Sequence, residues 1–415
     1  MSWRVFDNMK FANYYYVGKN MNNLGDQLQI LTIDYIYQQM GIKKDDIVYI
    51  DMDELPYYNG CPVILPVSMP LMNYNEHGIA GMFSNKITPV FLGLTLAKEF
   101  LLPEEVAYYK NHEPVGCRDE RTYQTLCKYE ISAYLGGCIT VVLPKRKGSG
   151  NGKIFLIEPA NGVKKYLPLE IIQKGIVDKH LFYGTMLNPK QQAIERYNQY
   201  AAEATLVITS LLHCAVPCMA MGIPVILTKD AVSYRFAWLE ALMHIYTPED
   251  YSEIDWDPKP FDYESHKRRV LEFVKKRLFD SQTDEEIRDI HNFYMMRNRK
   301  PYIVDTFLPL KSFIDSTWKN RQGTYRYAVW GLTQMAEMVV DYISKNYPNA
   351  QLCHVYDIKY AYQLSGIVAE HPENIKKYPD ETVFVTTVSA QGPATKFFQE
   401  LGRPEDSYAL LSTMA

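Results

Sequence analysis

The residues of this chain that are best suited to chemistry lie between positions 204 and 225. Thr209 and Ser210 follow a short apolar run, and His213 comes three residues later, before Gly222 and a second apolar run. Such runs are typical of buried parallel strands, and open α/β sheets bind ligands where strands end and helices begin. The first turn of a helix starting near His213 offers unpaired N–H groups and a positive dipole end. Two hydroxyl groups and a histidine beside this turn predict an anion site.

The same segment resembles the polysaccharide pyruvyl transferase family. Members of that family have Thr-Ser-Arg-Leu-His-Gly at this point, followed by a helix and Gly-Ile-Pro-Val. Leu211 stands at the position of the family's arginine, and Cys214 follows the histidine where the family has glycine. The positions that agree are Thr209, Ser210, Leu212, His213, Gly222, Ile223 and Pro224.

Three shorter strings extend the resemblance, and they occur in the family's order. Residues 22–29, Asn-Asn-Leu-Gly-Asp-Gln-Leu-Gln, are similar to its N-terminal Asn-x-Gly-Asp motif. Residues 116–122, Gly-Cys-Arg-Asp-Glu-Arg-Thr, are similar to its Arg-Asp motif, and residues 135–138, Leu-Gly-Gly-Cys, to the turn that follows. Together the motifs span roughly residues 10 to 245, and the chain is identified as a member of this family.

The resemblance implies a pair of Rossmann-type domains in a GT-B-like arrangement and a transferase activity. The pyruvyl group of phosphoenolpyruvate would be moved onto a sugar of an exopolysaccharide or other cell-surface polysaccharide precursor, forming a ketal. The acceptor sugar would be carried on a nucleotide or a lipid. No cofactor and no metal are expected, since phosphoenolpyruvate is itself the donor substrate.

The resemblance also implies roles for individual residues. His213 and Asp26 are the predicted catalytic residues. A histidine at a helix N-terminus should have a lowered pKa unless an anion is bound. Asp26 at a helix start fits structural capping as well as contact with an acceptor hydroxyl. The predicted substrate-binding residues are Asn23, Gly25, Arg118, Asp119, Thr209, Ser210, Leu212 and Arg235.

The leucine at position 211 removes one positive charge from the expected donor site. Losing a desolvated, charge-assisted bond to an anion should cost roughly 2 to 4 kcal/mol. Arg235 and Arg121 are the candidates to replace the missing charge. Arg118 could bind the donor with Asp119 orienting it, although a structural ion pair between these two residues fits the sequence equally well.

Composition bounds the class of protein. The chain has 415 residues, of which 47% are hydrophobic and 22% charged, as in ordinary soluble globular proteins. A net charge of −4 gives no reason to expect nucleic acid as a partner. No apolar run approaches the ~20 residues that span a bilayer, so a cytoplasmic protein is expected, with peripheral membrane contact and oligomeric state left open. The seven scattered cysteines lack zinc-ligand spacing and indicate reduced thiols.

Three α/β segments are expected, at residues 1–146, 153–318 and 320–415. Their alternating strands and helices predict parallel sheets covered on both faces. Strands are predicted at residues 11–17, 47–50, 61–67, 88–92, 114–117, 139–143, 154–157, 206–208, 225–227, 325–330, 352–356, 382–388 and 408–411. Helices are predicted at residues 24–40, 120–128, 189–204, 266–279, 284–299, 333–345 and 394–400, and from residues 213 and 236 onward. The helices between 266 and 299 could pack across the first two segments.

Two glycine-containing stretches resemble phosphate-binding loops. Residues 145–153 are glycine-rich and basic but are followed by a predicted strand, which favours a linker. Gly331, Thr333 and Ala336 form a degraded dinucleotide fingerprint, and Asp357 lies where a ribose ligand would be expected. A small Rossmann-like domain for assembly or for nucleotide-sugar contact is predicted there, in preference to a redox site.

Two alternative functions stay open at this stage. A GT-B glycosyltransferase would bind a nucleotide sugar and could use Glu240 for the ribose. A non-catalytic relative would act in polysaccharide assembly through its C-terminal segment. The chain also has 33 tyrosines, including the clusters at residues 14–16 and 57–58, which suit core packing and sugar stacking alike.

Overall fold

The structure is a computed structural model that describes residues 10–16, 21–68, 70–71, 82–96, 101–183, 187–230, 232–295, 307–319, 323–358, 363–387 and 390–410. The chain divides into two compact units. Unit 1 comprises residues 1–95 and 103–302, and unit 2 comprises residues 96–102 and 303–415. All the predicted site residues therefore lie in unit 1, and each unit is described by itself.

The first sheet of unit 1 has four parallel strands in the order β3-β1-β4-β6. The strands are Lys10–Tyr15 (β1), Ile47–Asp51 (β3), Val63–Val67 (β4) and Ile87–Phe91 (β6), close to the predicted runs. Every residue of β4 is buried, as expected of an apolar strand that is covered on both faces. The register pairs Tyr15 with Asp51, so the carboxyl ends of β1 and β3 lie side by side.

The second sheet of unit 1 has five parallel strands in the order β11-β10-β13-β14-β15. The strands are Lys153–Ile157 (β10), Ile176–Asp178 (β11), Ala204–Thr209 (β13), Val225–Thr228 (β14) and Ile245–Tyr246 (β15). Helix α5 (Pro189–Glu203) leads into β13, and α6 (Leu212–Ala220) follows it. The strands and helices that were predicted here are confirmed.

Both sheets place their first strand between the second and the third. The strand orders, 2-1-3-4 in the first sheet and 2-1-3-4-5 in the second, are those of doubly wound α/β proteins, which bind ligands where the order reverses. In the second sheet the reversal falls between β10 and β13. The backbone N–H of Ser210, after β13, donates to the carbonyl of Glu158, after β10 (3.1 Å). Helix α6 therefore begins beside the position where a ligand is expected.

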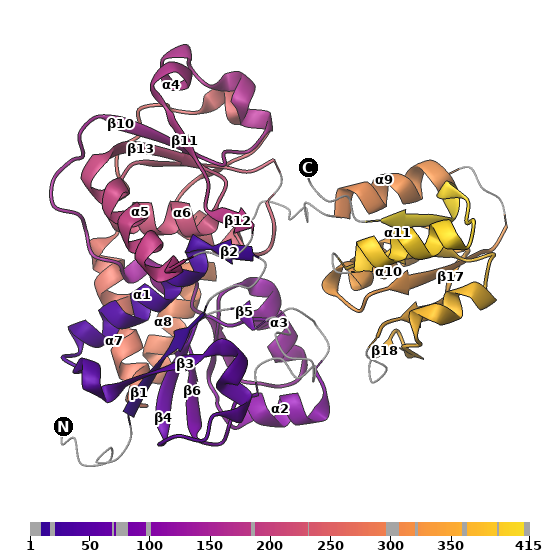
Figure 1. The fold of residues 1–415 in the computed structure, drawn as a ribbon, viewed down its shortest axis with the longest axis horizontal. Helices are drawn as coiled ribbons and strands as arrows, with labels where there is room; N and C mark the ends of the chain where they lie inside the picture. Colours follow the sequence, from indigo (N-terminus) through magenta and orange to yellow (C-terminus); the bar gives the residue numbers. More distant parts are fainter. Residues whose placement is uncertain are drawn as a thin grey trace. The chain divides into compact units, whose positions relative to one another are not determined.

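Helix α1 (Leu24–Gln39) lies between the two sheets in Figure 1. Leu24 and Leu28 pack with Phe155 and Val207 in the core of the second sheet. The hydroxyl of Tyr37 donates to the carbonyl of Ala12 in β1 (2.7 Å). The helix is buried on several faces because it packs against the first sheet and the second sheet of unit 1.

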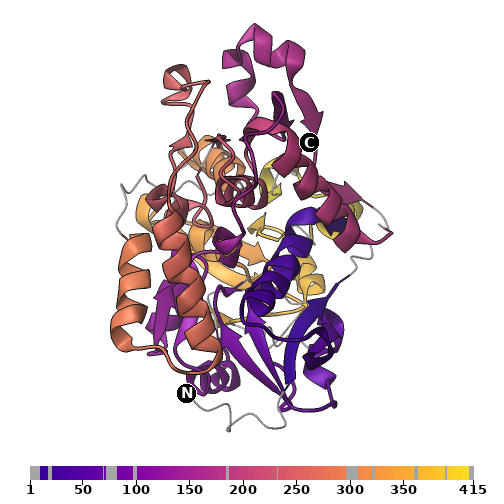
Figure 2. The same ribbon diagram turned by 90° about the vertical axis from the view of Figure 1, so that its left-hand side faces the viewer.

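Helices α7 (Glu264–Leu278) and α8 (Asp284–Met295) run side by side in Figure 2 and confirm the helices predicted there. Tyr263, just before α7, donates its hydroxyl to the carbonyl of Val141 (2.9 Å), and Lys267 donates to the carbonyl of Ala220 at the end of α6 (2.7 Å). The N–H of Leu135 donates to Nδ1 of His291 in α8 (3.0 Å). These helices therefore contact both parts of unit 1, as predicted.

Two elements differ from the prediction. Residues 139–143, predicted as a strand, form the 3₁₀ helix Ile139–Val142, which is fully buried and contacts α1, α6 and α7. Its apolar run is explained by this burial and not by sheet pairing. The helix predicted from Phe236 is only the 3₁₀ turn Ala237–Ala241. Residues 145–153 form the predicted loop, with Gly148, Gly150 and Gly152 at positive φ.

The remaining elements of unit 1 are short. Strands β8 (Val115–Cys117) and β9 (Ala133–Leu135) form a parallel pair, and α3 (Glu120–Lys128) connects them where a helix was predicted. The others are β2 (Met21–Asn23), β12 (Leu181–Tyr183), β5 (Pro70–Leu71), α2 (Pro103–Lys110) and α4 (Leu169–Lys174). Strand β7 (Thr95–Leu96) spans the boundary between the units. The predicted element ends at residues 17, 296–299, 388 and 411 lie outside the described residues.

Unit 2 contains a four-stranded parallel sheet in the order β17-β16-β20-β21. Its strands are Tyr325–Trp330 (β16), Ala350–Tyr356 (β17), Thr382–Val385 (β20) and Tyr408–Leu410 (β21). Helices α10 (Gln334–Asn346) and α11 (Gln391–Glu400) were predicted, whereas α9 (Phe307–Trp318) was missed. The hairpin strands β18 (Gln363–Leu364) and β19 (Ile367–Val368) complete the unit. The predicted Rossmann-like α/β sheet is confirmed.

The degraded dinucleotide fingerprint forms a turn that is closed by its own contacts. Gly331 has a φ of +103°, and a Cβ there would lie 2.4 Å from Cγ2 of Thr387. The N–H of Leu332 donates to Oδ2 of Asp357 (2.8 Å), and the hydroxyl of Thr333 donates to the carbonyl of Thr386 (2.6 Å). Asp357 therefore holds the backbone of the turn.

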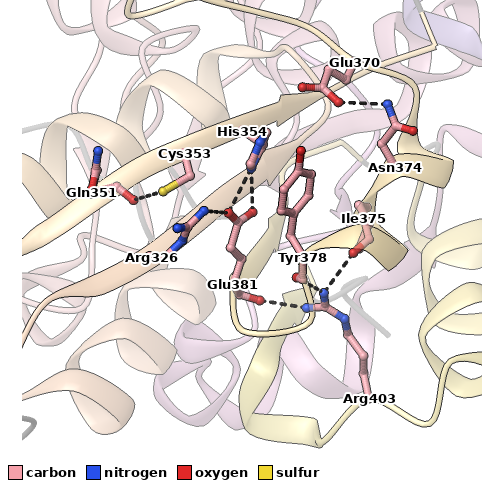
Figure 3. Close-up of polar contacts among 10 residues, drawn as sticks. All are labelled: Arg326, Gln351, Cys353, His354, Glu370, Asn374, Ile375, Tyr378, Glu381 and Arg403. Atoms are coloured by element: carbon pink, nitrogen blue, oxygen red, sulfur yellow. Dashed lines mark hydrogen bonds and ion pairs between the residues drawn. The ribbon is translucent and has the colours of Figure 1, made fainter.

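A buried carboxylate organises one side of unit 2 (Figure 3). Glu381 is 1% exposed, and its side chain accepts from Nη2 of Arg326 (3.0 Å) and from His354 (2.9 Å). The guanidinium of Arg403 donates to the backbone carbonyls of Glu381 (2.7 Å) and Tyr378 (2.6 Å). Pairing and hydrogen bonding satisfy the buried charge, which indicates a structural role.

Candidate anion-binding site in unit 1

His213 is the second residue of α6 and is largely buried, with 8% exposure. Its ring packs directly on Gly25 at the start of α1, where an added Cβ would lie 2.5 Å from Nδ1. Only glycine leaves room for this contact. The hydroxyl of Tyr197 donates to the backbone carbonyl of His213. The structure thus joins two predicted site residues that come from different sequence motifs.

The start of α1 is capped by Asn23 and not by Asp26. The side-chain oxygen of Asn23 accepts from the N–H of Gly25 (2.8 Å), which is the usual N-cap contact. Asp26 lies in the first turn and is partly buried. Burial raises its pKa to about 6, although the charges of Arg118 and Arg235 act in the opposite direction. The capping interpretation of Asp26 is therefore wrong, and its carboxyl lies within electrostatic reach of two arginines.

Arg118 is completely buried at the carboxyl end of β8. Its Nε donates to Oγ1 of Thr95 (2.9 Å), while Nη1 and Nη2 lack a partner among the described residues. Oγ1 of Thr95 donates in turn to Oδ2 of Asp119 (2.8 Å), and Asp119 caps α3 by accepting from the N–H of Thr122 (2.9 Å). Asp119 thus orients Arg118 through Thr95, a residue that the sequence reasoning missed.

Arg235 supplies a second positive charge to the same place. Its charge acts on Asp26, Arg118 and His213, and its Nε is buried without a partner among the described residues. The other candidate, Arg121, stacks on the ring of Tyr234 at 4.5 Å. Of the two arginines considered as replacements for the charge lost at position 211, Arg235 is the one whose charge acts on His213.

The electrostatic state of the cluster follows from burial. Burial lowers the pKa of His213 well below its usual value, and the charges of Arg118 and Arg235 lower it further. Burial and the charge of Arg235 also lower the pKa of Arg118. The imidazole of His213 is therefore neutral beside two cationic groups, and an anion arriving there would favour its protonation.

The two hydroxyls at the carboxyl end of β13 are hydrogen-bonded to the backbone. Oγ1 of Thr209 accepts from the N–H of Leu211 (3.0 Å), and the hydroxyl of Ser210 donates to the carbonyl of Glu158 (2.6 Å). Leu212 is buried, and Leu211 packs against the core of the second sheet. These four residues shape the start of α6, and the anion-binding role that was predicted for Thr209 and Ser210 stays a prediction.

Cys138 completes the contacts of the histidine, and the sequence reasoning did not include it among the site residues. Its Sγ lies 3.8 Å from Nε2 of His213, and its buried thiol accepts from the hydroxyl of Thr140 (3.2 Å). Gly137, at a φ of +66°, lets the chain pass close to Trp238, since a Cβ there would lie 2.9 Å from the indole ring. The Gly-Gly-Cys string was the signal that could have identified Cys138.

The site as a whole is a buried, cationic cluster. Buried guanidinium N–H groups without partners are costly, and an anion is the ligand that would satisfy them. Among the described residues, no group of three or more His, Cys, Asp or Glu side chains could hold a metal ion. Within the same described ranges, none of the helices is long and apolar enough to cross a membrane.

The fold and the site define a parallel α/β protein with a buried cationic cluster at the carboxyl end of its strands. The sequence profile of the polysaccharide pyruvyl transferase family matches residues 23–228, a range that contains Gly25, Asp26, Arg118, Cys138 and His213. The chain therefore contains a polysaccharide pyruvyl transferase family domain over these residues.

Other comparisons add little. No curated protein matches the chain. A solved structure of a functionally uncharacterised protein from Klebsiella pneumoniae subsp. pneumoniae NTUH-K2044 is similar, with 14% identity over 53% of this chain and 83% of that one. Its TM-score of 0.32 is too low to support an argument about fold or function.

Proposed function

We propose that this protein transfers the pyruvyl group of phosphoenolpyruvate onto a sugar of a polysaccharide precursor, forming a ketal. The family domain supports the reaction class. The observation that carries the proposal is the buried guanidinium of Arg118, whose Nη1 and Nη2 have no partner among the described residues. Phosphoenolpyruvate carries a phosphate and a carboxylate close together, and Arg118 with Arg235 would bind these two groups.

His213 would supply the proton for C3 of the donor. The free site holds this imidazole neutral, because burial and two neighbouring arginines lower its pKa. Binding of a multiply charged anion would offset the arginine charges and raise that pKa, so that His213 could take up a proton. Transfer of this proton to C3 leaves C2 electron-deficient, which is the state that a sugar hydroxyl attacks.

Asp26 would accept the proton of the attacking hydroxyl. Its pKa of about 6 lies near neutral pH, which suits a general base. The hydroxyl oxygen bonds to C2, the C2–O bond to phosphate breaks, and inorganic phosphate leaves. A second hydroxyl of the same sugar then adds to C2 and releases its proton, which closes the ketal. In this proposal the two parallel sheets of unit 1 form a GT-B-like pair around the site.

Calorimetric titration with phosphoenolpyruvate tests the proposal, with wild type compared with Arg118→Met. Methionine fills similar space without a charge. Removing the two unpartnered buried Nη groups offsets the loss of the Nε bond to Thr95, so the free energy of unfolding should change little. Loss of a charge-assisted bond of at least about 2 kcal/mol predicts a roughly 30-fold weaker affinity. His213→Ala should weaken binding as well.

Arg277→Met provides a matched control. Arg277 is also buried in unit 1, but its Nη2 already donates to the carbonyl of Pro114 (2.8 Å). This variant should lose stability and keep its affinity for phosphoenolpyruvate. Titrations with UDP, GDP and dTDP test the glycosyltransferase alternative in parallel. A wild-type protein that binds one of these nucleotides and not phosphoenolpyruvate would contradict the proposal.

A further inference from the structure

A separate cavity of about 470 Å³ lies in unit 1 at the carboxyl end of the first sheet. Tyr14, Tyr15 and Tyr16 at the end of β1, together with Tyr49 in β3, form its aromatic wall. Residues 187–191 and Ile194, around the start of α5, also line it, and α1 contributes Gln27 and Ile30. Pockets that hold small ligands have volumes of roughly 300–1,000 Å³, so this one is large enough for a ligand.

Two rings of the aromatic wall are exposed, and one of these is held in place by hydrogen bonds, whereas Tyr14 is buried. Tyr15 is 56% exposed and Tyr49 is 46% exposed, so neither ring serves mainly to fill the core. Asp34 accepts from the hydroxyl of Tyr49 (2.7 Å), from Nζ of Lys190 (2.6 Å) and from Nδ2 of Asn13 (2.7 Å). The Lys190 ammonium also lies 4.8 Å from the centre of the Tyr49 ring. These bonds orient the ring before any ligand arrives.

The polar groups of the cavity indicate the chemistry of its ligand. Lys190 is paired with Asp34, so its positive charge is compensated. The other polar lining groups include the amides of Gln27, Asn188 and Gln191, which are neutral donors and acceptors. A phosphate or nucleotide would find no unpaired cation among these groups. Exposed aromatic faces beside neutral amides fit a ring with an apolar face and hydroxyls at its edge, which describes a pyranose.

The cavity adjoins the anion-binding cluster. Gln27 follows Asp26 in α1, and its Nε2 donates to the carbonyl of Tyr16 (2.8 Å). Burial raises the pKa of Tyr16, and the nearby charge of Asp26 raises it further, so the two side chains lie within electrostatic reach. We infer that this tyrosine-lined cavity binds a sugar ring of the acceptor and presents its hydroxyls toward Asp26. The inference rests on the proposed function for the identity of the reaction, while the site itself can be tested alone.

Saturation-transfer NMR with methyl glycosides of glucose, galactose, mannose and N-acetylmannosamine tests the cavity, with phosphoenolpyruvate affinity measured in parallel. Tyr15→Ala should weaken glycoside binding about tenfold, because a stacking face is lost, and should leave phosphoenolpyruvate affinity within twofold. Tyr15→Phe keeps the face and should retain most of the binding. Tyr57→Ala is the matched control, since Tyr57 is also 56% exposed and lies outside the cavity.

The outcomes separate this inference from the proposed function. Glycoside binding that Tyr15→Ala weakens, with phosphoenolpyruvate affinity unchanged, supports the cavity as the acceptor site. No glycoside binding to the wild type, or binding that Tyr15→Ala and Tyr57→Ala affect equally, overturns it and leaves the donor site standing. Glycoside binding that depends on Tyr15 without any phosphoenolpyruvate binding retains the sugar site and overturns the proposed reaction.

Discussion

Replacing Asp26 with asparagine should stabilise the protein relative to wild type, and this gain in the free energy of unfolding should be larger at neutral pH than at mildly acidic pH. The carboxyl has a folded-state pKa of about 6, raised by burial from 3.8, and asparagine has a similar shape without the charge. Unfolded Asp26 loses its proton near pH 3.8, whereas folded Asp26 keeps it until about pH 6. Its contribution to stability is therefore full at low pH and is lost as the pH rises through 6.

The shift from 3.8 to about 6 corresponds to about 3 kcal/mol over the whole pH range. About 1.4 kcal/mol of this change falls between pH 5 and pH 7.5. Asp26→Asn should therefore gain that much more stability relative to wild type at pH 7.5 than at pH 5. Urea denaturation, followed by intrinsic fluorescence at the two pH values, measures the difference. If the two units unfold in separate transitions, the free energy is taken from the transition whose midpoint the substitution changes.

Asp315 in unit 2 provides a control of opposite sign. Burial acts to raise its pKa, but bonds from Lys311, Tyr342 and Tyr347 outweigh burial and lower it to about 2. Asp315→Asn should therefore lose stability, equally at pH 5 and pH 7.5, because both lie above the pKa in either state. If Asp26→Asn and wild type change in parallel between these pH values, then Asp26 is not a buried carboxyl whose charge is costly, and the proposed base loses its support.

Two further predictions concern packing. Gly25→Ala would place a Cβ 2.5 Å from Nδ1 of His213, so the imidazole or α1 must shift. We expect the free energy of unfolding, measured by urea denaturation, to fall by about 1–3 kcal/mol, and phosphoenolpyruvate binding, measured by calorimetry, to weaken. Unchanged affinity would contradict the proposed donor site. Glu381→Gln replaces the carboxylate that His354 and Arg326 contact in unit 2. The free energy of unfolding of this unit should fall by about 2 kcal/mol, while phosphoenolpyruvate affinity stays constant. An unshifted unfolding transition would show that the carboxylate network is not stabilising.

Local patterns in the sequence were sufficient for most of the elements. Helix α3 begins and ends where the sequence predicts it, because Asp119 is an N-cap residue and its motif precedes a helical pattern. Most strands of both sheets in unit 1 are short apolar runs that are bounded by polar or turn residues, and they were found within a few positions. The short edge strands β11 and β15 of the second sheet were not predicted. The order of the family motifs was equally readable, because it depends on residue types alone.

The secondary-structure prediction failed at residues that are buried by packing against helices and not by pairing in a sheet. Residues 139–143 are as apolar as a central strand, yet they form a 3₁₀ helix beneath α1, α6 and α7. An apolar run indicates that a segment is buried, but it does not indicate whether the segment itself forms a strand or a helix. Asp26 was similarly ambiguous, because Asn23 three residues earlier has the same capping chemistry and takes that position.

By itself the sequence determined the parallel α/β class, the location of most strands and helices, and the candidates Gly25, Asp26, Arg118 and His213. Only the tertiary structure decided that Gly25 touches His213, that Thr95 holds Arg118 with its Nη1 and Nη2 unpartnered, and that the hydroxyl of Ser210 is used by the backbone. The physical reason is that strand and helix patterns arise from neighbours in the chain. The contacts of Arg118 and His213, in contrast, involve residues that are distant in the sequence and that only tertiary packing brings together.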